Sequence, residues 1–314
     1  MVRISPNELS FGSVESIKPI YGHAPPGKPP LARGSFYRAF TAGFSPYNLV
    51  TEPDFHRHSE LRKMLLPAFS QRGLLEQEVI LSSETVDRWI HSTGHRAPPR
   101  SDGIDMTRWF DLGSFDILGE MAFRETFRAV ETAVNPYLIT LIDNARHITL
   151  VAKLFNLLVP TRLALNETRF VMPLAQLVRD GKMDKEQMAA NMFILTVAGQ
   201  ETTTASLSAT LYLLLKHAEK LERLVSEIRD AFRSYGDTEA QSIQRLPYLQ
   251  AVISESLRMF PPISVGHVLP RVSAGFELHG QYIPPGAEVF TSPWTITHDP
   301  QNFADPMNST LNGG

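Results

Sequence analysis

The residues best suited to chemistry lie together in one run, Ala198-Gly199-Gln200-Glu201-Thr202, inside a segment of helical pattern. A glycine in a helix interior costs about 1 kcal/mol relative to alanine, and a buried carboxyl costs more unless it is paired or hydrated. Thr202 could bond a carbonyl or a trapped water and so open the helix locally. We interpret the run as a polar pocket for a small diatomic ligand with a proton path. The alternative is a kinked helix with Glu201 at the surface.

Charged side chains at helical spacing form further candidate sites. Glu255 and Arg258 stand three residues apart and can pair on one helix face, although such pairs are usually solvated and contribute little. His58 and Arg62 stand four residues apart, so both can reach one anion from the same face; the alternative is an ordinary charged surface. A single arginine, Arg271, lies near the end of a predicted strand and indicates little by itself.

A long helix must position the first of these sites. Asp184 is a good N-cap, and Gln187 follows three residues later as in a capping box. The helical pattern then continues to about His217 without a proline, which corresponds to about 50 Å at 1.5 Å per residue. Its middle, residues 192–198, is apolar almost all round, which predicts burial.

The rest of the chain is mainly helical in pattern until a run of prolines, after which short apolar segments alternate with glycine and proline. This change predicts a small antiparallel sheet within residues 263–293, with turns near His279-Gly280 and Pro284-Pro285-Gly286. Residues 1–50 predict an edge strand or two, short helices and a long loop. The other expected helices span residues 54–69, 74–90, 105–128, 218–232 and 246–259.

Composition excludes several classes of chemistry. The 314 residues include no cysteine, so they form no disulfide, thiolate nucleophile, cysteine-ligated zinc or iron–sulfur cluster. With 43% hydrophobic and 20% charged residues, the chain is typical of a folded globular protein. A net charge of −3 calls for no nucleic-acid partner. No apolar stretch is long enough to span a bilayer, so we expect this chain to be soluble and to carry no membrane anchor.

The order and spacing of these signals resemble the cytochromes P-450, which are heme-thiolate monooxygenases. The run from Ala198 to Thr202 resembles the oxygen-binding motif of that family's long central helix. Glu255 and Arg258, followed by Phe260-Pro261-Pro262, resemble its structural pair. The resemblance covers the chain from Met1 to about Pro306.

The basic residues fit the same family. His58 and Arg62 resemble the residues of a helix that holds a heme propionate, and Arg271 matches a second propionate contact. The segments 105–117 and Ala122-Phe123 are similar to fungal secondary-metabolism members. The resemblance therefore implies heme b as the cofactor, a small lipophilic secondary metabolite as the substrate and an NADPH-dependent reductase as the electron donor.

The resemblance also implies roles for the central run. Thr202 with Glu201 would guide protons to bound oxygen, and Gly199 beside Ala198 would give the oxygen room. The substrate would contact three segments, residues 23–47, 193–198 and 263–265.

The implied fold is a cytochrome P-450 fold, mainly α with a small antiparallel β-sheet. We expect a single incomplete domain over residues 1–306, α-rich to about residue 262, with its small β region at residues 263–293 and a non-family tail at 307–314. Family members are anchored in the endoplasmic-reticulum membrane, whereas this chain by itself is expected to be cytoplasmic.

The chief departure from the family is the axial cysteine, which these residues lack. The heme-ligand loop, the helix that follows it and the arginine that completes the network of Glu255 and Arg258 have no counterpart here. We therefore expect a form truncated at both ends that binds no stable heme-thiolate centre and is inactive. The alternatives are a non-enzymatic binding or partner protein, and a fragment of a mispredicted gene.

Overall fold

The computed structural model describes residues 1–22, 30–41, 44–66, 69–70, 85–95, 103–123, 126–134, 178–264 and 269–309. The chain divides into two compact units, unit 1 with residues 1–40 and 209–314, and unit 2 with residues 41–208. The long helix α10 (Lys185–Lys216) contributes residues to both. The one-domain prediction over residues 1–306 stays a prediction.

Unit 2 is helical where the structure describes it. Its helices are α2 (Phe55–Leu65), α4 (Val86–His95), α5 (Met106–Phe123), α6 (Ala129–Thr132) and most of α10. Most of the helix predicted at 74–90 lies outside the described residues, and its end falls in α4.

Caps fix where these helices begin. Asp54 accepts a hydrogen bond from the backbone N–H of Arg57 (2.8 Å) at the start of α2. Asp184 accepts from the N–H of Gln187 (2.7 Å), as its predicted N-cap role requires. Because the first N–H groups of a helix lack intrahelical partners, such acceptors stabilise these ends.

Two apolar clusters hold unit 2 together. In the first, Trp109, Leu112 and Phe115 of α5 contact Phe193 of α10, together with its Ala189 and Ala190. The second joins the buried face of α2 to α10, through Leu61, Leu65, Met183, Met188 and Met192. The predicted burial of the middle of α10 is confirmed at residues 192–194, but Ala198 is exposed. Among the described residues, the apolar clusters that pack against α10 include Met192 and Phe193 but not Ala198.

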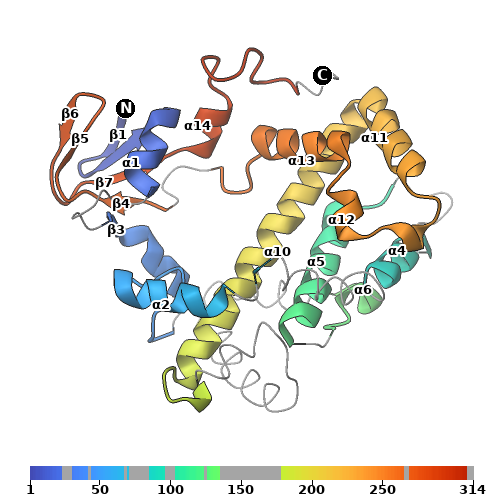
Figure 1. Ribbon diagram of the computed structural model, residues 1–314, viewed down its shortest axis with the longest axis horizontal. Coiled ribbons are helices and arrows are strands. Elements are labelled where there is room, and N and C mark those ends of the chain that lie inside the picture. The colour runs from blue at the N-terminus through green and yellow to red at the C-terminus, as the bar shows by residue number, and fades with distance from the viewer. Residues whose placement is uncertain are drawn as a thin grey trace. The chain divides into compact units, whose positions relative to one another are not determined.

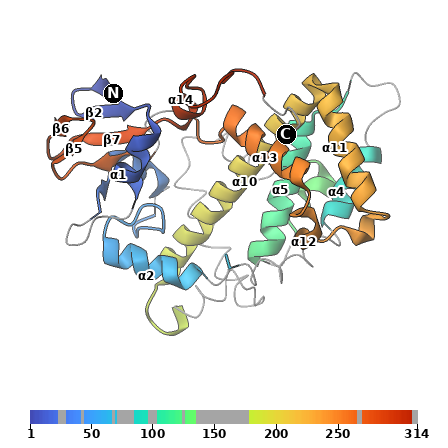
Figure 2. The ribbon, with the colours of Figure 1, turned by 45° about the horizontal axis from the view of Figure 1, so that its top comes forward.

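Unit 1 combines a small sheet with a helical part. Its main helices are α1 (Ile17–Tyr21), α11 (Ala218–Ala231), α12 (Ala240–Ile243), α13 (Pro247–Met259) and α14 (Pro293–Thr297). Short 3-10 turns occur at Val14–Ser16, Ser35–Thr41 and Tyr235–Asp237. Helices α11 and α13 lie side by side in Figures 1 and 2, joined by a cluster of Leu214, Leu224, Tyr248 and Val252.

The sheet of unit 1 combines strands from the two ends of the described chain. Its order is β1 (Val2–Ser5), β2 (Glu8–Phe11), β7 (Glu288–Thr291), β4 (Arg271–Val272) and β3 (Ala32–Arg33). Strands β5 (Phe276–Leu278) and β6 (Gln281–Ile283) form a separate antiparallel hairpin. His279 and Gly280, both with positive φ, form the predicted turn of that hairpin. Strands β2 and β7 lie next to each other in Figure 2.

The predicted fold class is confirmed, with one refinement. The prediction was a small antiparallel sheet at residues 263–293 and an edge strand or two within residues 1–50, whereas β2 joins the sheet and pairs in parallel with β7. The cause is burial, because Leu9 and Phe11 of β2 pack with Ile283 and Val289 in one apolar cluster. Within the described residues, no helix is long and apolar enough to cross a membrane.

Candidate functional site

The predicted oxygen motif lies on α10 with its side chains in ordinary helical contacts. The Thr202 hydroxyl donates to the backbone carbonyl of Ala198 (2.7 Å), which is one of the two partners expected from the sequence. Gly199 faces α5, where a methyl group on its Cα would come within 2.9 Å of Leu118 Cδ2. The glycine therefore permits close packing of α5 against α10, and its role beside bound oxygen stays a prediction.

Two carboxylates and an amide adjoin this motif. Gln200 is fully buried, and its Nε2 donates to Asp111 Oδ1 of α5 (2.7 Å). Glu201 is exposed over the residue as a whole. Nevertheless, the pKa of its carboxyl is raised, mainly by partial burial and in addition by repulsion from the Asp111 carboxylate. A carboxyl with a raised pKa can hold a proton at a higher pH than an ordinary glutamate. This property is what a proton donor on α10 requires.

His58 and Arg62, the two candidate residues of α2, lie one helical turn apart, as their spacing predicts. His58 is half-buried and Arg62 is exposed, beside the buried stripe of Leu61 and Leu65. The helix therefore presents both side chains from one face while its apolar side packs on α10. Part of the segment that follows α2, residues 67–68, lies outside the described residues.

Arg271 lies in unit 1, among aromatic rings. Its Nη1 donates to the hydroxyl of Tyr37, and its guanidinium lies 5.3 Å from the ring centre of Tyr37 and 5.5 Å from that of Tyr21. Arg33 lies 5.5 Å from the same Tyr37 ring. Burial raises the pKa of Tyr37, whereas the two guanidiniums oppose that shift, so the phenol stays neutral near pH 7.

Glu255 and Arg258 form a buried ion pair in unit 1. Arg258 Nε and Nη2 donate to the two carboxylate oxygens of Glu255 at 2.7 and 2.8 Å, and the side chains are only 7% and 11% exposed. Arg258 also donates to the backbone carbonyls of Thr297, Pro306 and Asn308, at 2.8–3.0 Å. The interpretation from spacing alone, a solvated pair, is therefore wrong.

Comparison with known proteins decides the family. A model of the family described as cytochrome P-450 matches residues 166–308. Over 98% of its length the chain is similar to three fungal proteins, cytochrome P-450 monooxygenases BOT4 of Botryotinia fuckeliana (46% identical), ORF9 of Penicillium roqueforti (39%) and stcF of Emericella nidulans (30%). It covers 63%, 65% and 68% of those relatives. The chain belongs to the cytochrome P-450 family.

The basic groups of this P-450 chain fit part of a heme site. Guanidinium and imidazole groups on half-buried or exposed positions suit carboxylates such as heme propionates. His58 and Arg62 belong to unit 2, and Arg271 belongs to unit 1. A thiolate ligand for the heme iron is not provided, because the 314 residues include no cysteine. Among the residues that the structure describes, no cluster of three histidines or carboxylates could hold a metal ion.

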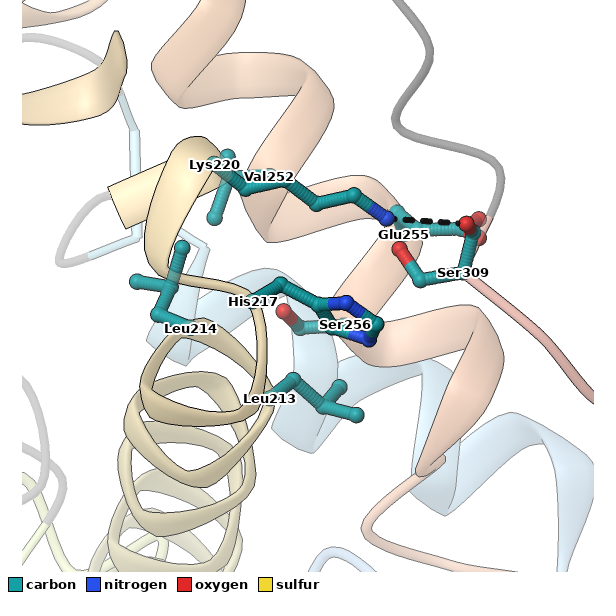
Figure 3. A pocket seen from close by; sticks show the side chains of 8 residues that line it. All are labelled: Leu213, Leu214, His217, Lys220, Val252, Glu255, Ser256 and Ser309. Carbon is teal, nitrogen blue, oxygen red and sulfur yellow. Dashed lines mark hydrogen bonds between the residues drawn. The ribbon is translucent and has the colours of Figure 1, made fainter. Parts of the chain in front are cut away.

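A small hollow adjoins the ion pair of the P-450 chain in unit 1 (Figure 3). Lys220 extends across it and donates from Nζ to the backbone carbonyl of Ser309 (3.0 Å). The hollow is lined by Leu213, Leu214, His217, Lys220, Val252, Glu255, Ser256 and Ser309. Lys220 and Arg258 together thus fix the main chain of residues 306–309.

Several residues that contact the candidate site residues of this P-450 chain were not predicted from the sequence. Gln200 lay inside the predicted motif but was given no role, although a polar residue on a helix side that packs against another helix is a usable signal. Arg33 and Tyr37 stand four residues apart, a spacing that could have indicated a shared contact. The expected substrate segments lie partly outside the described residues, which omit residues 23–29, 42–43 and 265–268.

Proposed function

We propose that this chain carries the proton-handling and propionate-binding parts of a monooxygenase that hydroxylates a small lipophilic secondary metabolite. The observation that carries the proposal is the position of the Glu201 carboxyl directly beside the Thr202 hydroxyl on α10, where that hydroxyl is held by the Ala198 carbonyl; the raised pKa of Glu201 supports it. The names of the relatives, all fungal monooxygenases, support the reaction class. Electrons would come from an NADPH-dependent reductase.

The residues of α10 would hold and move protons. Glu201 would hold a proton at its carboxyl and release it toward the site, because burial and Asp111 favour its protonated form. Thr202 would accept that proton at Oγ1 and pass on its own, since a hydroxyl can donate and accept at once. In the resting chain its proton is bonded to the carbonyl of Ala198, which keeps the hydroxyl in a fixed orientation.

The cofactor would be heme b, held at its propionates by His58, Arg62 and Arg271. Heme with a thiolate ligand supplies the oxygen activation that such enzymes need. The thiolate would have to come from outside these 314 residues, because they include no cysteine. We therefore propose that the chain by itself does not turn over.

The second candidate is a non-enzymatic role, as a binding protein or as a partner of another polypeptide. The observation that favours it is the same lack of a cysteine. In that case the fold would be retained for its surfaces, and the proton-handling residues would have no reaction to serve.

A chimera tests the enzymatic proposal. The chain is joined to the part of the 46% identical relative that it does not match, and oxidation is measured with a reductase, NADPH and a lipophilic compound that changes the heme spectrum. Thr202→Ala should send a larger share of the NADPH electrons into hydrogen peroxide and less into product. Thr203→Ala, at an exposed neighbouring position, is the matched control. Equal coupling in both variants would overturn the assigned role of Thr202.

A further inference from the structure

Three polar side chains follow one another along a single face of α10. Gln200, Thr204 and Ser208 stand four residues apart, and residues at this spacing lie one above the other on a helix. Gln200 is fully buried, and the other two residues are partly buried. Their oxygen atoms Oε1, Oγ1 and Oγ are closed off from bulk solvent, and within the described part of the chain none of the three has a hydrogen-bond partner. We call these residues the polar row.

The two hydroxyls of the polar row do not use the partner that the helix itself offers. A serine or threonine in a helix can donate to the backbone carbonyl four residues earlier. Thr196, Thr202 and Ser206 of α10 do so, at 2.9, 2.7 and 2.7 Å. Thr204 and Ser208 form no such bond to any described residue. Because a buried polar atom without a partner costs free energy, these hydroxyls require a partner that is not a protein group of the described ranges.

The spacing of the polar row fits single water molecules between its members. Four residues of helix rise about 6 Å. Two hydrogen bonds that meet at one water span about 5.6 Å. A water between Gln200 and Thr204, and another between Thr204 and Ser208, would therefore each contact two polar side chains. Buried waters in proteins occupy positions of this kind, where they bond to polar groups that otherwise lack partners.

One end of the polar row meets a carboxylate. The side chain of Gln200 that presents the unpartnered Oε1 also donates from Nε2 to Asp111 Oδ1 of α5 (2.7 Å). Asp111 in turn lies close enough to Glu201 for its charge to contribute to the raised pKa of that carboxyl. A water bound at Gln200 Oε1 is thus one side chain away from both carboxyl groups.

We propose that the polar row binds a file of buried waters, and that these waters carry protons between solvent and the Gln200–Asp111 bond beside Glu201. The ligand of the site is water, and Gln200, Thr204 and Ser208 act by positioning it. Each water accepts one proton and releases another to its neighbour, so no other bond forms or breaks. The inference that this file reloads Glu201 with protons rests on the proposed function, whereas the file itself does not.

Hydrogen exchange at the Gln200 side chain tests the proposal in the 314-residue chain. NMR follows the Nε2 protons after transfer to heavy water, and their signal is identified by its loss in Gln200→Met. Below the unfolding transition the rate should not change with urea, because exchange through the file needs no unfolding. Thr204→Val removes the hydroxyl and should slow exchange by about tenfold, through loss of one hydrogen bond to the waters. Thr204→Ser should keep the rate, as should Thr203→Val at an exposed neighbouring position.

Stability gives a second measurement, for which a dry interface predicts the opposite sign. If the Thr204 hydroxyl bonds to water, Thr204→Val should raise the unfolding equilibrium constant about fivefold. In a dry interface the unpartnered hydroxyl is unfavourable, and the valine variant would be the more stable protein. A more stable valine variant, or one with unaltered exchange at Gln200, overturns the inference.

A second variant keeps the test decisive. Should Thr204→Val not fold, Ser208→Ala is read instead, and it should slow exchange at Gln200 in the same way. Unaltered exchange in a folded Ser208→Ala chain would equally overturn the inference. None of these measurements involves heme, so their failure leaves the roles of Glu201 and Thr202 to be decided by the chimera.

Discussion

Gln200 of α10 and Asp111 of α5 are joined by a 2.7 Å hydrogen bond at a point where the glutamine is completely buried. In the part of the chain that the structure describes, the Oε1 atom of this glutamine has no hydrogen-bond partner. The bond thus fixes α5 beside the run from Ala198 to Thr202, and it places Asp111 where its charge adds to the effect of burial in raising the pKa of Glu201. The buried side chain of Gln200 therefore contributes both to the packing of α5 on α10 and to the position of Asp111 near Glu201.

Removal of this amide should destabilise the chain. Gln200→Ala removes the buried hydrogen bond from Nε2 to the Asp111 carboxylate, and we expect a loss of about 1–3 kcal/mol in the free energy of unfolding, measured with urea. Gln301→Ala replaces an exposed glutamine and should change that free energy by less than about 0.5 kcal/mol. Equal effects of the two substitutions would show that the bond contributes nothing.

The buried ion pair should contribute far more than an exposed pair of the same spacing. Arg258→Ala removes the buried guanidinium that pairs with Glu255 in two hydrogen bonds, and we expect a loss of about 3–5 kcal/mol in the free energy of unfolding. Arg128 and Glu131 are also three residues apart, but they are 69% and 62% exposed with a 3.8 Å separation. Arg128→Ala should therefore cost less than about 1 kcal/mol. Arg258→Lys should not restore stability, because lysine cannot form the bidentate contact.

Glycine-to-alanine substitutions should have opposite results in two helices. Gly94 of α4 has open space around its Cα, so Gly94→Ala should stabilise by up to about 1 kcal/mol through helix propensity. Gly199→Ala should give no such increase in the free energy of unfolding, because the new methyl group would come within 2.9 Å of Leu118 Cδ2. Adding Leu118→Ala should restore the gain, as a double-mutant cycle would measure. Independent effects at the two positions would contradict the close packing.

The stability of the chain should depend on pH through Glu201. Its pKa is raised in the folded state, so its contribution to stability is complete below the ordinary glutamate pKa and is lost as the pH rises through the raised value. Glu201→Gln removes this dependence. We expect the unfolding free energy of the variant, minus that of the unaltered chain, to increase with pH over that window and then level off. Parallel pH curves would contradict the raised pKa.

Local patterns predicted the elements of this fold well. The N-cap at Asp184 and the pattern that follows it place α10 to within one residue at each end. The turn at His279-Gly280 followed from residue type, because glycine adopts a positive φ without strain. Such features depend on residues that are neighbours in the sequence, which is why they could be predicted.

Long-range features could not be predicted from residue patterns. The parallel pairing of β2 with β7 joins Glu8 to Glu288, and no local signal specifies that register. Similarly, Ile253 and Leu257 of α13 are apolar residues four apart, yet they are 41% and 42% exposed. Val252, next to Ile253 on the same helix, is only 1% exposed, because burial is decided by what packs against each side.

The most direct test of the central claim is the carbon monoxide difference spectrum of the reduced chimera, compared with that of the 314-residue chain. We expect the chimera to show the spectrum of a thiolate-ligated heme, because under the proposed function His58, Arg62 and Arg271 would hold the heme propionates. The chain alone should lack that spectrum, since it includes no cysteine. A folded, soluble chimera that binds no heme, or binds it without the thiolate spectrum, would contradict the assignment.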